Sequence, residues 1–130
     1  SAYTEDRLRS MSKSEPDPEC GDVYTEPKNI KPRDAITGEM DRLELEAIIY
    51  PTWSNPPRKI GDIESPSGDN SQRIPPHTGM PGITVPMGYT YNDLPAGLQI
   101  VGRLFSEATL IEIAYAYEQS TMYRISPEVY

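Results

Sequence analysis

A long proline-rich connection, residues 51–81, limits the folds that are open to this sequence. It joins a short apolar run at residues 47–50 to two further apolar segments between residues 82 and 102. Connections longer than about 12–15 residues without secondary structure are uncommon in compact domains and are usually functional. We therefore expect the chain to be part of a larger folded body. The residues that punctuate this connection are Gly61, Gly68, Gly79, Pro51, Pro56, Pro57, Pro66, Pro75 and Pro76.

The segments before this connection predict a helix and a strand. Asp34 stands where an N-cap is expected, and residues 33–45 carry an apolar stripe at helical spacing: Ile36, Met40 and Leu43. Residues 47–50 are short, apolar and partly β-branched, and Pro51 ends them, which is the pattern of a buried strand. Residues 1–30 are rich in proline and charge without a sustained period. We expect an irregular segment there, followed by a folded segment at 31–130.

The segments after the connection predict a hairpin and a second helix. Residues 82–87 and 96–102 are apolar runs joined by a turn region at 88–95, which favours an antiparallel pair. Ser106 is expected to cap a helix to about Thr121, whose apolar stripe is Leu110, Ile113, Ala114, Tyr117 and Thr121. The expected chain is α/β, with about three strands and two to three helices. Three strands are too few to bury this apolar surface on both sides.

Composition excludes several classes of partner. The chain has 20 acidic and 12 basic residues and a net charge of −8, which argues against nucleic acid and against a polybasic membrane contact. No apolar run approaches the length of a membrane span. Cys20 is the sole cysteine and His77 the sole histidine, so we expect no metal site of these residues and no Ser–His triad. The single cysteine favours a cytoplasmic location without assigning one.

Two places carry candidate binding residues. Trp53 follows the end of the first predicted strand, a position where α/β sheets often contact ligands. The alternative for Trp53 is a packing role with its N–H bonded to backbone. Asp69 and Asn70 lie in a loop, residues 65–72, that is dense in hydrogen-bonding side chains. They could hold a substrate amine or amide, and the alternative is ordinary turn chemistry.

Three spaced motifs in the second half resemble the C-terminal end of the amidase signature family. The first has Gly79 and Pro81, then Pro86 and Gly88. The second reads Leu94-Pro95-Ala96-Gly97-Leu98-Gln99-Ile100-Val101-Gly102. The third places Ala114, Glu118 and Gln119 on the last predicted helix, and the run at residues 47–52 resembles the strand that precedes these motifs in the family. The resemblance covers about residues 31–130.

That resemblance implies both a fold and a chemistry. The fold would be a mixed β-sheet covered by helices, of which this chain supplies the C-terminal part. The chemistry would be hydrolysis of carbon–nitrogen amide bonds through a serine nucleophile, a second serine on a cis peptide and a lysine, without a cofactor or metal. The Gly- and Ser-rich motif that carries the nucleophile does not occur in this sequence. We therefore expect the catalytic residues in upstream sequence, and we expect this chain alone to be inactive.

The same resemblance singles out one substrate contact. In glutamine-using amidotransferases of the family, an aspartate ten residues before the glycine of the first motif holds the amino group of the substrate. Asp69 has that placement relative to Gly79. Asp69 is thus the best candidate contact, with Asn70 beside it and Trp53 as a third.

The sequence leads to one main hypothesis and two alternatives. In the main hypothesis the chain is the C-terminal segment of an amidase; it completes a sheet and one wall of the substrate pocket. Its partners would be the N-terminal catalytic part of the same enzyme and a small amide substrate. The chain alone would be poorly stable, because its strands would have unpaired edges. The alternatives are a non-catalytic binding module derived from an amidase and one product of proteolytic nicking.

Overall fold

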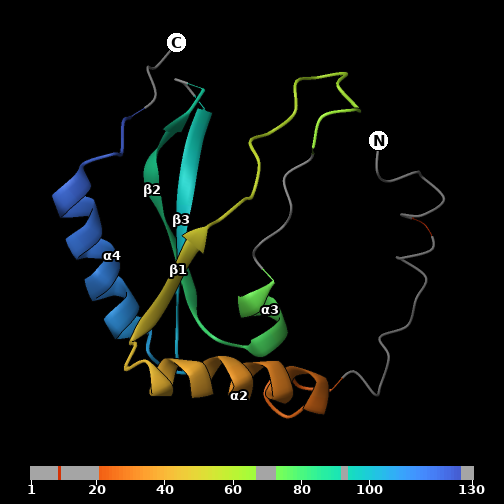
Figure 1. The fold of residues 1–130 in the computed structure, drawn as a ribbon, viewed down its shortest axis with the longest axis vertical. Helices are drawn as coiled ribbons and strands as arrows, with labels where there is room; N and C mark the ends of the chain where they lie inside the picture. The colour runs from red at the N-terminus through yellow and green to blue at the C-terminus, as the bar shows by residue number, and fades with distance from the viewer. Residues whose placement is uncertain (1–8, 10–20, 67–72, 92–93, 127–130) are drawn as a thin grey trace.

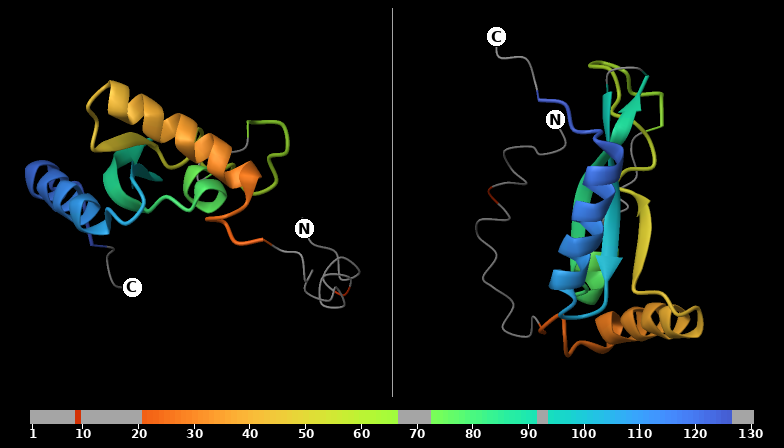
Figure 2. Two further views of the ribbon diagram at one scale, coloured as in Figure 1. Left: turned by 90° about the horizontal axis from the view of Figure 1, so that it is seen from below. Right: turned by 90° about the vertical axis from the view of Figure 1, so that its left-hand side faces the viewer.

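The computed structural model describes Arg9 and residues 21–66, 73–91 and 94–126. Three strands form one antiparallel sheet in the order β1-β3-β2. Helix α4 lies along one face of the sheet, α3 lies on the other side, and α2 crosses one end (Figures 1 and 2). This arrangement confirms the predicted α/β class. The elements are α2 (Pro27–Arg42), β1 (Ala47–Pro51), α3 (Ile74–Thr78), β2 (Gly82–Thr90), β3 (Leu94–Gly102) and α4 (Glu107–Thr121).

The predicted hairpin is confirmed, and it is longer than expected. β2 pairs with β3 from Gly82 opposite Val101 to Thr90 opposite Leu94, so most of the predicted turn region at 88–95 is strand. A bulge between Pro86 and Gly88 lets the pairing continue. Gly88 has a φ of 117°, a left-handed conformation that favours glycine. The turn lies within the predicted region but is shorter than expected, because Pro86 and Gly88 flank a bulge rather than end the strand.

Helix α2 differs most from its prediction. It begins at Pro27, within the segment expected to be irregular, and ends at Arg42. Its N-cap is Glu26, so the expected capping by Asp34 is wrong. Pro27 fits because the first helical position needs no N–H donor, and Pro32 lies inside the helix. Of the predicted stripe, Met40 is buried and Leu43 lies exposed beyond the end of the helix. The division of the chain near residue 30 stays a prediction.

Two apolar clusters occupy the two faces of the sheet. One contains the buried side chains Val85, Ile100, Leu110 and Ala114, so the predicted stripe of α4 packs on this face. The other contains Met40, Met80 and Val101, with Ile36 and Ile74 packed against it. Ile100 and Val101 are neighbours in β3 that point to opposite faces, and both are almost fully buried. The core therefore lies on both sides of the central strand.

Strand β1 forms as predicted but is not a buried strand. Among the described strands it pairs only with β3, and it lies at one edge of their sheet. Ile49 is consequently 62% exposed, while Ile48 and Tyr50 pack against the second cluster. An apolar run of four residues cannot by itself distinguish an edge from a central strand.

The connection at 51–81 contains a short helix that the sequence did not predict. α3 ends at Thr78, and Gly79 follows it as the C-cap with a φ of 72°, which suits glycine. The buried Arg33 of α2 donates hydrogen bonds to the carbonyl oxygens of Thr78 and Tyr24, each at 3.1 Å. These bonds join α2 to α3 and to the segment before α2. No helix in the described part of the chain is both long and apolar enough to cross a membrane.

Candidate functional site

The segment that follows β1 runs past the first residues of β3. The backbone N–H of Thr52 donates a hydrogen bond to the carbonyl oxygen of Gly97 at 2.8 Å. A Cβ at Gly97 would come within 2.9 Å of Thr52 Oγ1 and 2.8 Å of Thr84 Cγ2. Glycine is therefore required at 97 for this close approach. From this attachment point the segment diverges from the hairpin toward residues 53–66, as Figure 1 shows.

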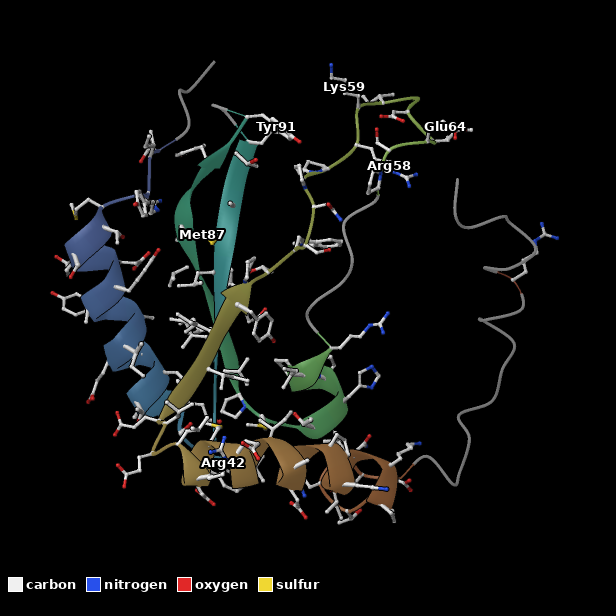
Figure 3. All side chains as sticks on the ribbon, in the orientation of Figure 1. Arg42, Arg58, Lys59, Glu64, Met87 and Tyr91 are labelled. Atoms are coloured by element: carbon white, nitrogen blue, oxygen red, sulfur yellow. The ribbon has the colours of Figure 1, made fainter. Side chains whose placement is uncertain are left out.

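A groove of about 500 Å³ lies between this segment and the hairpin. Prolines and other apolar side chains make up most of its wall, and its polar members carry only hydroxyl and amide groups. Met87, labelled in Figure 3, contributes from β2. The lining residues are Pro51, Trp53, Ser54, Asn55, Pro56, Pro57, Met87, Thr90, Pro95, Ala96 and Gly97.

Of the three predicted site residues, the structure places one. Trp53 lines the groove and is 52% exposed, and its contact with a ligand stays a prediction. Asp69 and Asn70 lie outside the described residues. Their role as substrate contacts therefore remains a prediction.

A second, wider depression continues from the groove past Asn55, Pro56 and Pro57. It is lined by charged side chains as well, including Arg58, Lys59 and Asp62. Figure 3 shows Arg58, Lys59 and Glu64 on this loop and Tyr91 at the hairpin tip. The Ser65 hydroxyl and the backbone N–H groups of Ser65 and Glu64 donate to the Asp62 carboxylate, and these hydrogen bonds lower the pKa of Asp62.

Two buried polar groups on the face opposite α4 were missed by the sequence analysis. Tyr50 of β1 stands opposite Gln99 of β3. Within the described residues, the Tyr50 hydroxyl and Gln99 Oε1 are buried without a hydrogen-bond partner. Burial raises the pKa of Tyr50, because the charged phenolate loses water. The sequence carried a partial signal for Gln99 alone, since the period of two places it on the same strand face as Val101.

The groove offers binding groups and no complete catalytic set. Ser54 and Thr90 supply hydroxyls, but the described lining contains neither a histidine nor a lysine that could activate them. Among the described residues, no cluster of three or more His, Cys, Asp or Glu side chains could hold a metal ion. The described lining suits the holding of a ligand by its shape and by neutral hydrogen bonds.

Comparison with known proteins gives consistent matches. The family model described as Amidase matches residues 6–111. A glutamyl-tRNA(Gln) amidotransferase subunit of Oceanobacillus iheyensis is 38% identical over 98 residues, which cover 70% of this chain and 20% of that protein. The corresponding subunit of Clostridium botulinum is 41% identical over 102 residues, 72% of this chain and 21% of that protein.

Solved structures agree with the sequence matches. The native peptide amidase of Stenotrophomonas maltophilia superposes with a TM-score of 0.61 at 28% identity. The match covers 97% of this chain and 25% of that protein. The chain thus spans about a fifth of the length of the curated relatives it matches.

Proposed function

This chain belongs to the amidase family, and from that premise we propose that it is the C-terminal segment of an enzyme that hydrolyses carbon–nitrogen amide bonds. The observation that carries the proposal is the family match over residues 6–111 in a chain that spans about a fifth of its relatives. The chain would complete the sheet of the enzyme and form one wall of its substrate pocket. Its partner would be the upstream part of the same enzyme.

The sequence supports placing the catalytic residues upstream. The family's chemistry uses a serine nucleophile in a Gly- and Ser-rich motif, a second serine and a lysine. No such motif occurs here, and Lys13, Lys28, Lys31 and Lys59 are not in a matching context. The nucleophile, its base and the donors to the oxyanion would therefore come from the upstream part.

The residues of this chain would hold the substrate rather than react with it. Trp53 would contact the body of the amide, since its indole is half exposed on the groove. Asp69, with Asn70 beside it, would accept hydrogen bonds from an amine or amide N–H of the substrate. Such contacts act by orientation: they hold the carbonyl carbon within reach of the upstream nucleophile. The groove wall would also displace water around the reacting amide.

Complementation tests the main proposal. The 130-residue chain, the upstream segment of its gene and the two together are each assayed for ammonia release from simple primary amides. We expect activity only when both parts are present, because each lacks groups that the reaction needs. Activity of the 130-residue chain alone would overturn the proposal. Association without hydrolysis of any amide would favour the non-catalytic binding module.

A pair of aspartate variants tests the proposed substrate contact. Asp69→Asn keeps the size of the side chain and removes its charge, so the KM for an amide with a free amino group, such as glycinamide, should rise about tenfold or more. Asp62→Asn is the matched control on the same connection, and its KM should stay within about twofold of wild type. Equal KM values for the two variants would remove Asp69 from the site.

A further inference from the structure

The groove beside Trp53 has no charged side chain in its described lining. That is unusual for this chain, in which 25% of the residues are charged. The neighbouring depression, which shares Asn55, Pro56 and Pro57 with the groove, is lined by Arg58, Lys59 and Asp62. The change from neutral to charged surface therefore occurs within one loop. The uncharged surface belongs to the beginning of that loop, where Thr52 is hydrogen-bonded to Gly97 of the sheet.

The neutral groove is also held in shape by its own backbone. Pro51, Pro56 and Pro57 fix their φ angles along one wall, and Pro95 does so on the other. The Thr52–Gly97 hydrogen bond joins the two walls at their base. A preformed groove costs little conformational entropy when it is filled. Its volume of about 500 Å³ lies within the range of small-molecule sites, about 300–1,000 Å³.

The chemistry of the lining selects the occupant. A charged group that entered the described groove would lose hydration without meeting a counter-ion there. An apolar group would meet proline rings, the Trp53 indole and the flexible Met87 side chain, which adapts to irregular shapes. Ser54, Asn55 and Thr90 carry the neutral donors and acceptors that suit an amide group.

We propose that this groove is the subsite for an uncharged apolar group of the amide substrate, with Trp53 as its aromatic wall and Met87 as its adaptable contact. The inference rests on the proposed amidase function and deepens it. It assigns the enzyme to amides whose body is aromatic or aliphatic where it passes Trp53. Trp53 is then the residue that sets specificity, and it takes no part in bond cleavage.

Two amides that differ by one charge test the subsite in the assembled enzyme. The first is 3-phenylpropanamide, and the second is 3-(4-carboxyphenyl)propanamide, which adds a carboxylate to the same ring. Wild type should prefer the neutral amide by about tenfold or more in kcat/KM. Trp53→Ala should lower kcat/KM for the neutral amide by about tenfold or more and leave that for the charged amide within about twofold. Trp53→Phe should keep most of the preference.

The matched control is Tyr115→Ala, which removes an exposed aromatic side chain from α4. This variant should leave kcat/KM unchanged for both amides. Trp53 is the sole tryptophan of the chain, so 5-fluorotryptophan introduced into this chain alone gives one ¹⁹F resonance. The neutral amide should shift that resonance in the assembly, and the charged amide should not. This readout does not depend on hydrolysis.

The outcomes separate the subsite from the proposed function. If no amide is hydrolysed but the neutral amide alone shifts the resonance, the amidase proposal fails and the subsite stands. If amides are hydrolysed, Trp53→Ala affects both probes equally and neither shifts the resonance, the subsite is overturned and the amidase proposal stands. If neither probe shifts the resonance and Trp53→Ala prevents assembly, the upstream part fills the groove, and the subsite is again overturned.

Discussion

The two ends of the sheet differ in how much of their apolar surface this chain covers by itself. At the closed end, which α2 crosses, the side chains of Met40, Met80, Val101 and Leu110 are nearly fully buried. The exposed apolar side chains of the described residues there, Leu43, Leu45 and Phe105 among them, remain around this core. At the open end, formed by residues 53–66 and the hairpin tip, Trp53, Ile60, Ile63 and Tyr91 are exposed. The closed end is thus held by contacts that the chain makes alone. The open end presents apolar surface to other groups, and it contains the candidate site.

The largest expected effect comes from equivalent truncations at the two ends. Leu110→Ala removes a buried side chain that packs against Val85 and Ile100, so the free energy of unfolding around β3 should fall by about 2–5 kcal/mol. Ile63→Ala removes an exposed side chain and should change it by less than about 0.5 kcal/mol. Hydrogen–deuterium exchange of β2 and β3 peptides measures both. If both variants lowered the free energy of unfolding equally, the side chains of the open end would also be packed against the rest of the chain.

A smaller effect should separate a buried from an exposed arginine of α2. Arg33→Met leaves the carbonyl oxygens of Thr78 and Tyr24 without their donor, which should cost about 1–3 kcal/mol. The control, Arg42→Met, breaks only an exposed bridge to Glu39 and should cost less than about 0.5 kcal/mol. Figure 3 shows Arg42 on α2.

Exchange rates of peptides covering 21–26 and 73–80 are the measurement for this pair. They should rise in Arg33→Met and stay at the wild-type value in Arg42→Met. Faster exchange of the same peptides in both variants would show that the positive charge of α2, rather than the two hydrogen bonds of Arg33, holds α3 in place.

Local patterns predicted the hairpin and α4 correctly, because apolar periodicity decides both elements. α4 buries Leu110 and Ala114 at the expected spacing. Ser106 is the N-cap residue as predicted, but its hydroxyl donates to the Arg103 carbonyl rather than capping the helix. The start of α2 was missed because Pro27 reads as a helix breaker, although the first helical position accepts proline.

The candidate site was only partly predictable. Trp53 could be singled out because it follows a strand end, yet the groove depends on the approach of Thr52 to Gly97, which are far apart in sequence. The burial of Arg33 and Gln99 likewise depends on tertiary contacts. Charged and amide side chains are mostly exposed, so composition argues against burying them until the packing is known.

The smallest expected effect concerns Tyr50, which lies between the two ends. Its hydroxyl is buried and unpartnered within the described residues, so Tyr50→Phe should change the free energy of unfolding by less than about 1 kcal/mol at pH 8, or stabilise slightly. Burial raises the pKa of Tyr50 above its usual value of 10.0. The unfolded chain therefore loses this proton first as the pH rises.

The sign of the pH effect follows from that order of titration. Stability from the neutral Tyr50 is fully present below pH 10 and is lost as the pH rises from 10 through the higher pKa of the folded state. In urea denaturation, the stability of Tyr50→Phe relative to wild type should be greater at pH 10.5 than at pH 8. Tyr115→Phe, on the exposed side of α4, controls for the loss of a hydroxyl in water. If Tyr50→Phe lowers the free energy of unfolding by well above about 1 kcal/mol at pH 8, the Tyr50 hydroxyl has a hydrogen-bond partner. The buried contacts of the closed end would then reach to Tyr50, toward the groove.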